Sequence, residues 1–190
     1  MRIGLLGGSF DPPHNGHLLA AGDAHTALEL DRVVFIPAAV QPLKVGYVNA
    51  AAAQRLAMVR LMAEGDPRFE VSEIEIDRGG LSYTVDTLTT LAAQMPSAEL
   101  FWLIGADVPQ SFAKWRDPER IVELATVVVL QRSGEVPDLS GLPGPPQLLP
   151  SRRFDVSSTE IRQRVREGKS IRGFVPDAVA EYIASERLYR

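Results

Sequence analysis

The fold of this chain is decided by a stretch near its beginning, Gly8-Ser9-Phe10-Asp11-Pro12-Pro13-His14-Asn15-Gly16-His17. An apolar run, Ile3-Gly4-Leu5-Leu6, precedes it, and helix-forming residues follow from Leu18 to Leu30. The short apolar run is typical of a buried strand and the longer one of a helix. The sequence therefore places this motif on a turn from a strand into a helix, where parallel α/β proteins bind phosphates.

The residues of this turn suit an anionic ligand. Gly7 and Gly8 have no Cβ, so the backbone can approach a ligand closely. The free N–H groups and the positive dipole end of the following helix favour an anion, typically by ~0.3–1 kcal/mol. His14 and His17 are three residues apart, which places both imidazoles on one side of the first helical turn. A glycine pair alone is ordinary turn chemistry, but packing does not require two histidines beside it, so we expect the histidines to hold one phosphate together.

Strand-like and helical patterns alternate along the chain. The sequence predicts strands over Arg2–Leu6, Arg32–Ile36, Phe69–Ile76, Glu99–Ile104 and Thr126–Gln131. It predicts helices over Gly16–Leu30, Ala51–Glu64, Thr84–Gln94, Pro118–Leu124, Ser158–Glu167 and Pro176–Glu186. This alternation is typical of an α/β fold with a Rossmann-like, doubly wound, mostly parallel sheet and helices on both faces. We expect one domain over 1–190, made of a core over 1–132, a Pro- and Gly-rich loop over 133–150 and a helical part over 151–190.

The composition excludes several classes of protein. The chain has 190 residues, a formal net charge of −4 and no cysteine. The negative charge argues against a nucleic-acid-binding face, and the lack of cysteine excludes disulfides and thiolate zinc sites. No apolar run is long enough for a signal peptide or a membrane span. We therefore expect a cytoplasmic protein without nucleic-acid or membrane partners, and a homo-oligomer stays open because core and interface helix faces look alike.

A second motif lies far along the chain, Val156-Ser157-Ser158-Thr159-Glu160-Ile161-Arg162. Ser157 followed three residues later by Glu160 fits a capping box, so we expect a helix to begin there and run toward Gly168. Capping does not account for Arg162, which would lie one turn inside, close to the anion-binding end of the helix. A guanidinium at that point could meet phosphates.

Two further segments follow predicted strands, Pro42-Leu43-Lys44 and Gly105-Ala106-Asp107. In open sheets of this class, ligands bind beyond the carboxyl ends of the strands. We therefore expect both segments to converge with the glycine–histidine turn on one cleft. Asp107 precedes Val108-Pro109, so an ordinary helix N-cap is the alternative interpretation of that residue.

Gly8 to His17 resembles the signature of the HxGH nucleotidyltransferases, which transfer an adenylyl group from ATP or a cytidylyl group from CTP to a phosphate-bearing acceptor. Val156 to Arg162 resembles the Ile-Ser-Ser-Thr-x-Ile-Arg element with which that family holds the ATP phosphates. Ile104 to Asp107 resembles its Ile-Gly-x-Asp element, which lines the adenine and takes ribose hydroxyls. The resemblance implies that ATP is bound by Gly7, Gly8, Ser9, Phe10, His14, His17, Ile104, Gly105, Asp107, Ser157, Ser158, Thr159 and Arg162.

The stretch from Asp77 to Leu88 resembles the Arg-x-x-x-Ser-Tyr-Thr-x-x-Thr-Leu element of bacterial nicotinate-nucleotide adenylyltransferases. Trp115 matches their tryptophan, and the closing stretch from Val175 to Arg190 matches as well. The resemblance implies nicotinate mononucleotide as the acceptor, bound by Ser9, Lys44, Ser82, Tyr83, Thr84 and Trp115. An indole suits a pyridine ring, and donors at a helix N-terminus suit nicotinate better than nicotinamide. Helix capping and core packing are the alternative roles of these residues.

The resemblance also implies a mechanism, direct in-line transfer to the acceptor phosphate. His14 and His17 would hold α- and β-phosphate oxygens, Lys44 and Arg162 would neutralise the leaving pyrophosphate, and Mg²⁺ would arrive with ATP because the sequence has no dedicated carboxylate cage. One departure is the loop Gln41-Pro42-Leu43-Lys44, which is commonly Pro-Pro-His-Lys in the family. Leu43 cannot serve as a ligand-binding histidine, whereas Lys44 can still contact a phosphate.

Three other functions stay open on the sequence. A related enzyme could use nicotinamide mononucleotide or phosphopantetheine as its acceptor, although the Ser82-Tyr83-Thr84 turn and Trp115 weigh against phosphopantetheine. A non-catalytic protein could have kept only the ATP site, which the intact histidine pair argues against. A fragment of a class I aminoacyl-tRNA synthetase would be expected to carry a Lys-Met-Ser-Lys-Ser-like run, and this chain has none.

Overall fold

The computed structural model describes the chain apart from residues 45, 47–48, 133–136 and 152–154, and at residues 44, 132 and 151 it describes the backbone alone. Its strands are β1 (Arg2–Gly8), β2 (Arg32–Pro37), β3 (Phe69–Val71), β4 (Glu99–Gly105), β5 (Thr126–Arg132) and β6 (Gln147–Ser151). Its helices are α1 (Asn15–Ala27), the 3-10 helix η1 (Pro42–Lys44), α2 (Ala52–Ala63), α3 (Ile74–Arg78), α4 (Thr84–Gln94), α5 (Pro109–Phe112), α6 (Pro118–Leu124), α7 (Ser158–Arg166) and α8 (Asp177–Ser185).

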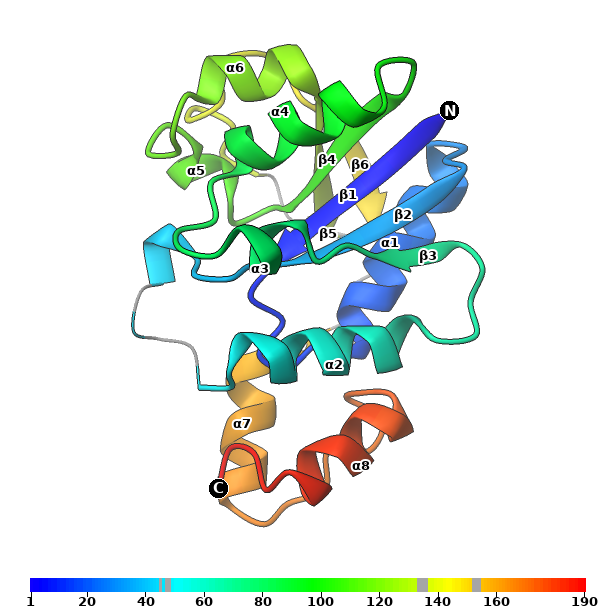
Figure 1. The fold of residues 1–190 in the computed structure, drawn as a ribbon, viewed down its shortest axis with the longest axis vertical. Helices are drawn as coiled ribbons and strands as arrows, with labels where there is room; N and C mark the ends of the chain where they lie inside the picture. Colours follow the sequence, from blue (N-terminus) through cyan, green and yellow to red (C-terminus); the bar gives the residue numbers. More distant parts are fainter. Residues whose placement is uncertain (45, 47–48, 133–136, 152–154) are drawn as a thin grey trace.

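The strands form one parallel sheet in the order β3-β2-β1-β4-β5-β6. The chain runs outward from β1 in one direction through β2 and β3, and in the other through β4, β5 and β6. The strand order therefore reverses between β1 and β4, and a crevice opens beyond the carboxyl ends of these strands at such a point. The predicted fold class, a Rossmann-like parallel sheet with helices on both faces, is confirmed (Figure 1).

Two apolar cores lie on opposite faces of the sheet, because neighbouring side chains of a strand point in opposite directions. In β4, Trp102 and Ile104 pack into the core beneath α4, α5 and α6. Phe101 and Leu103 pack into the other core, together with side chains of α1, α2, α7 and α8. Helices α7 and α8 extend the molecule past α2 (Figure 1). No helix of the described residues is long and apolar enough to cross a membrane.

The predicted strand over Phe69–Ile76 is wrong beyond Val71. Ile74 to Arg78 form the short helix α3 instead. Strand β3 pairs with β2 only as far as Val71, and the chain then closes local bonds, with the Asp77 amide donating to the Glu73 carbonyl at 2.8 Å. The alternating apolar and acidic residues that indicated a strand thus lie on a short helix, in which the acidic Glu75 is the buried residue. Every other predicted helix and strand is confirmed, with ends shifted by at most three residues.

The predicted loop over 133–150 is wrong at its far end. Residues Gln147 to Pro150 belong to β6, which pairs in parallel with β5 as an edge strand. An edge is the position in a sheet that tolerates a residue without an N–H, such as Pro150. Before this strand, Leu139 and Leu142 pack against the core beneath α5, so part of the described loop is anchored. Residues 133–136 lie outside the described residues.

Gly7 tests how tightly the end of β1 is packed. A Cβ at Gly7 would lie 2.8 and 2.9 Å from two indole carbons of the buried Trp102. Because a buried indole has little room to move, we expect Gly7→Ala to lower the free energy of unfolding by about 1–3 kcal/mol. Urea denaturation measures this loss. Gly144→Ala is the matched control, because a Cβ at Gly144 would meet no atom within 4 Å; an equal loss in both variants would contradict the packing argument.

Candidate active site

The glycine–histidine turn joins β1 to α1 as predicted. His14 is the N-cap of α1, and the rings of His14 and His17 stack with centroids 3.7 Å apart and 27° between their planes. The His14 backbone N–H donates to Nδ1 of His17 at 3.0 Å. Because Nδ1 of a neutral His17 then acts as the acceptor, its proton lies on Nε2. Both imidazoles thus lie side by side at the helix N-terminus.

Phe10 supports the histidines from the core. Its ring is 3% exposed and meets the His17 ring edge-on at 4.9 Å and the Phe35 ring at 6.0 Å. The φ of Phe10 is 49°, in the left-handed region that a side chain adopts only when its surroundings hold it. The side chain of this predicted ATP contact is therefore part of the core and packs against the His17 ring from that side.

The second sequence motif lies directly against this turn. Ser157 caps α7, its hydroxyl accepting from the Glu160 amide at 3.2 Å, as predicted. The Ser158 hydroxyl donates to the Pro12 carbonyl at 2.8 Å, and Nη1 of Arg162 donates to the Asp11 carbonyl at 2.7 Å. Two segments about 150 residues apart in the sequence are thus joined by hydrogen bonds. Nη2 of Arg162 also donates to the Thr159 hydroxyl at 3.2 Å, so that Thr159 orients the guanidinium.

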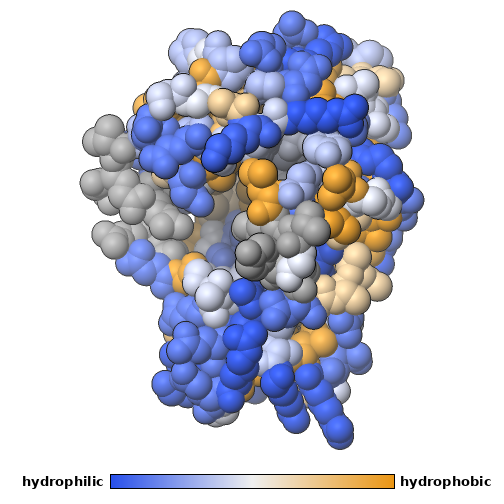
Figure 2. Space-filling view, turned by 90° about the vertical axis from the view of Figure 1, so that its left-hand side faces the viewer, coloured by the Kyte–Doolittle hydropathy of each residue, from blue (hydrophilic) through white to orange (hydrophobic). Residues whose placement is uncertain are grey.

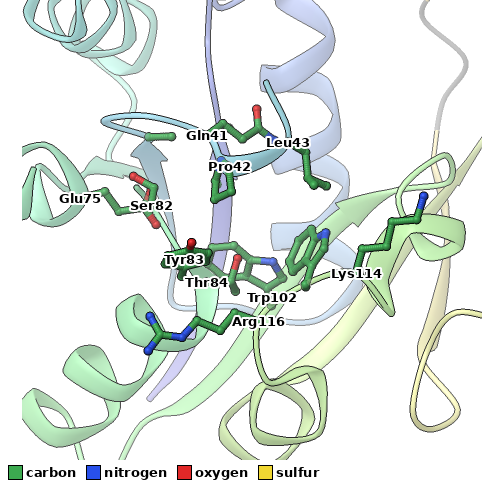
Figure 3. Close-up of a pocket in the computed structure, with 14 residues that line it drawn as sticks. Gln41, Pro42, Leu43, Glu75, Ser82, Tyr83, Thr84, Trp102, Lys114 and Arg116 are labelled. Atoms are coloured by element: carbon green, nitrogen blue, oxygen red, sulfur yellow. The ribbon is translucent and has the colours of Figure 1, made fainter. Parts of the chain in front are cut away.

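A pocket opens beyond the carboxyl ends of β1 and β2 (Figure 3). It holds about 630 Å³ of empty space, the part open to solvent included. Figure 2 views the side of the molecule on which β1 ends and shows a hollow there. The residues that line the pocket are Gly7, Gly8, Ala38, Gln41, Pro42, Leu43, Glu75, Ser82, Tyr83, Thr84, Trp102, Lys114, Trp115 and Arg116.

The pocket brings together most of the residues predicted to bind the acceptor. Tyr83 is the N-cap of α4 and Thr84 its first residue, and both face the space that Trp115 borders. The Trp115 ring stacks on the buried Phe112 ring with centroids 4.7 Å apart. Ser82 fixes the turn, because its hydroxyl accepts from the Ala39 amide at 2.9 Å. The turn is therefore held in place by the loop after β2.

Other predicted residues lie elsewhere. Ile104 is buried, and Gly105 lies so close to Asp107 that a Cβ would come within 2.8 Å of the carboxylate. None of these three borders the pocket among its described walls. The alternative interpretation of Asp107 as a helix N-cap is wrong, since Val108 is the N-cap of α5. The Ser9 hydroxyl donates to Oε1 of Gln41 at 2.5 Å.

The loop after β2 carries the departure from the family pattern. Leu43 is 53% exposed and borders the pocket, so an apolar side chain stands where a histidine is common. The backbone of Lys44 lies in η1, but its side chain is outside the described part of the structure. Within the described residues, no group of three or more His, Cys, Asp or Glu side chains could hold a metal ion.

Comparison with known proteins places this site in a family. Residues 5–164 match the family model described as "Cytidylyltransferase-like". A "Probable nicotinate-nucleotide adenylyltransferase" of Gemmatimonas aurantiaca is 52% identical over 199 residues, covering 100% of this chain and 93% of the relative. The chain belongs to the cytidylyltransferase-like nucleotidyltransferases, in their nicotinate-nucleotide adenylyltransferase branch.

Further relatives agree with this family. A "Probable nicotinate-nucleotide adenylyltransferase" of Thermus thermophilus is 48% identical, and the match covers 100% of both chains. A solved structure of the nicotinic acid mononucleotide adenylyltransferase of Plasmodium falciparum, complexed with NaAD, has a TM-score of 0.80 at 17% identity. It covers 99% of this chain and 97% of that one. At this low identity, the solved structure supports the fold alone.

Arg55 is a residue of the site that motif reasoning missed. It is 1% exposed and donates to three carbonyls, of Ser9 at 2.7 Å, Ala39 at 2.9 Å and Ala50 at 3.3 Å. Burial lowers the pKa of Arg55, and the nearby Asp11 carboxylate offsets part of this shift. A signal was present in the sequence, because residue 55 precedes Met58, Val59 and Met62 at helical spacing and so lies on the buried face of α2.

Glu75, Lys114 and Arg116 are further residues that line the pocket and were not predicted. Glu75 is buried and accepts from the Thr87 hydroxyl at 2.7 Å. Burial raises the pKa of Glu75, and hydrogen bonds from Thr87 and Ser82 oppose that shift. Arg116 lies over the Tyr83 ring at 5.0 Å and pairs with Asp86 at 3.3 Å. Lys114 and Arg116 thus bring positive charge to the pocket wall, and Glu75 adds a buried carboxyl group next to Ser82.

Arg55→Met tests the role of the buried guanidinium. The substitution leaves three carbonyls without this donor, so we expect the free energy of unfolding to fall by roughly 3 kcal/mol or more. Chemical denaturation followed by circular dichroism measures the loss. Arg60→Met, on the same helix, is the matched control. Arg60 is 55% exposed in its ion pair with Glu73, so its loss should cost no more than about 1 kcal/mol; equal losses would contradict the assigned role.

Proposed function

We propose that this chain transfers the adenylyl group of ATP to nicotinate mononucleotide, giving nicotinic acid adenine dinucleotide and pyrophosphate in NAD biosynthesis. One observation carries the proposal: a single pocket joins the glycine turn after β1, the N-terminus of α4 and the ring of Trp115. Relatives of this name, 48–52% identical over the whole chain, support it. Both substrates are phosphorylated metabolites, so we place the reaction in the cytoplasm.

Nicotinate mononucleotide occupies the pocket with its pyridine ring against Trp115. An electron-poor ring stacks well on an indole. The first N–H groups of α4 have no acceptor within the helix, and they meet the carboxylate at Tyr83 and Thr84. Lys114 and Arg116 at the rim of the pocket favour an anionic acceptor. Ser9 and Lys44, on the loops after β1 and β2, hold its phosphate.

ATP binds where α1 and α7 meet the glycine–histidine turn. The backbone of Gly7, Gly8, Ser9 and Phe10 lies against the nucleotide, and Ile104, Gly105 and Asp107 take its adenine and ribose. Ser157, Ser158 and Thr159 form the N-terminus of α7, whose dipole favours the phosphates. Arg162 lies one turn further on, its guanidinium already anchored on the Asp11 carbonyl.

The reaction is an in-line displacement at the α-phosphorus. An oxygen of the acceptor phosphate forms the new P–O bond, and the bond from the α-phosphorus to the bridging oxygen breaks to release pyrophosphate. His14 and His17 hold α- and β-phosphate oxygens, with Nε2 of His17 as a donor, while Arg162 and Lys44 neutralise the leaving group. ATP enters as its Mg²⁺ complex, so the ion comes as part of the substrate.

A parallel assay tests the acceptor. Purified protein with ATP and Mg²⁺ is given nicotinate mononucleotide or nicotinamide mononucleotide, and pyrophosphate and dinucleotide are measured. We expect a strong preference for the nicotinate substrate, because backbone donors at α4 match a carboxylate and leave the amide NH₂ of nicotinamide without a partner. Equal kcat/KM for both would contradict the assignment of the Ser82–Thr84 turn, and no turnover with either would contradict the proposed reaction.

His17→Ala tests the phosphate-binding histidine. We expect kcat to fall by about 100-fold or more, because one donor to the developing charge is lost. The melting temperature should fall only slightly, since His17 is partly exposed and its hydrogen bond with the His14 amide lies at a helix end. His25→Ala, at the last turn of the same helix, is the matched control and should keep its activity. Turnover of His17→Ala near that of the parent protein would rule out the role.

A further inference from the structure

The segment that follows α8 returns to the glycine–histidine turn. Arg187 and Tyr189 both have a left-handed backbone, with φ of 53° and 64°, and the Leu188 amide donates to the Ile183 carbonyl at 3.0 Å. This sharp turn buries the Tyr189 side chain to 8% exposure and directs its hydroxyl to Oδ1 of Asp11 at 2.8 Å. Non-glycine residues hold such a conformation only where their surroundings enforce it.

The carboxylate of Asp11 is fully occupied by donors. Besides the Tyr189 hydroxyl, Oδ1 accepts from the Ala50 amide at 3.1 Å, and Oδ2 accepts from the Asn49 amide at 2.8 Å. Asp11 is 4% exposed. Burial and the Asp11 carboxylate raise the pKa of Tyr189, so its hydroxyl keeps its proton and remains a donor.

Arg162 lies just outside this set of donors. Its Nη1 is 3.9 Å from Oδ2 of Asp11, beyond hydrogen-bond distance, and donates instead to the Asp11 carbonyl at 2.7 Å. Without the Tyr189 hydroxyl, Oδ1 would keep the Ala50 amide as its donor, and the less firmly held carboxylate could turn toward this guanidinium and form an ion pair with it. That ion pair would compete with any phosphate for the same N–H groups.

We infer that Tyr189 is a positioning residue for ATP: its hydroxyl holds the Asp11 carboxylate away from Arg162 and leaves the guanidinium available to the phosphates. The inference rests on the proposed function only in assigning Arg162 to ATP. Tyr189 itself does not contact a phosphate in this proposal, because its buried hydroxyl donates to Asp11. Tyr189, near the end of the sequence, thus acts on the site through Asp11 and Arg162.

The test compares two variants that each remove one phenol oxygen. Tyr189→Phe is expected to weaken the binding of a non-hydrolysable ATP analogue, measured by isothermal titration calorimetry, by roughly tenfold. It should raise the KM for ATP and leave the KM for nicotinate mononucleotide unchanged. Tyr182→Phe, in α8, is the matched control and should change neither. Equal rises in both KM values, or unchanged analogue binding, would overturn the inference.

A double-mutant cycle identifies the route of the effect. If Tyr189 acts through Arg162, then adding Tyr189→Phe to Arg162→Ala should weaken binding of the analogue no further. A full tenfold loss in that background would overturn the inference. Thermal unfolding checks that each variant is folded. If a variant unfolds near room temperature, its binding of the analogue is measured at a lower temperature at which it is folded.

The outcomes separate this inference from the proposed function. Weaker analogue binding by Tyr189→Phe, in a protein that does not turn over nicotinate mononucleotide, would refute the proposed reaction and support the positioning role. Normal turnover together with unchanged analogue binding would support the reaction and refute the positioning role.

Discussion

The parallel pairing of β1 with both β2 and β4 is the constraint on which the rest of the molecule depends. Because β2 and β4 leave β1 in opposite directions along the sheet, the loops that follow these strands diverge and leave a crevice above Gly8. The turn after β1 and the η1 loop after β2 both border the pocket in this region. The sheet order alone thus brings together segments that are far apart in the sequence.

Two buried charges then hold the turn in that crevice. Arg55 ties the Ser9 carbonyl to the loop after β2, and Asp11 ties the same turn to the start of α2 and to Tyr189. Buried charges are tolerated only when their hydrogen-bonding capacity is used. Here both side chains bond mainly to backbone N–H and C=O groups of irregular segments. These groups have no hydrogen-bond partners in a helix or sheet. The turn that carries the histidines is therefore held by hydrogen bonds within the protein itself.

Much of the fold and the centre of the site could be predicted because their signals are local. The His14–His17 spacing, the Ser157 cap and the start of α4 at Thr84 each follow from a few neighbouring residues. Strand β6 could not be predicted, because its conformation comes from pairing with β5 rather than from its own composition. The acceptors of Arg55 lie in the turn after β1 and at both ends of the connection between β2 and α2, so the sequence indicated a buried position but not its partners.

The two edges of the sheet differ from its centre in a way that bears on self-association. At one edge β3 has only three residues, and at the other β6 contains Pro150, which has no N–H to offer. Short or proline-bearing edges are poor templates for an additional strand. Growth of the sheet from one molecule into the next is therefore disfavoured at both of its edges.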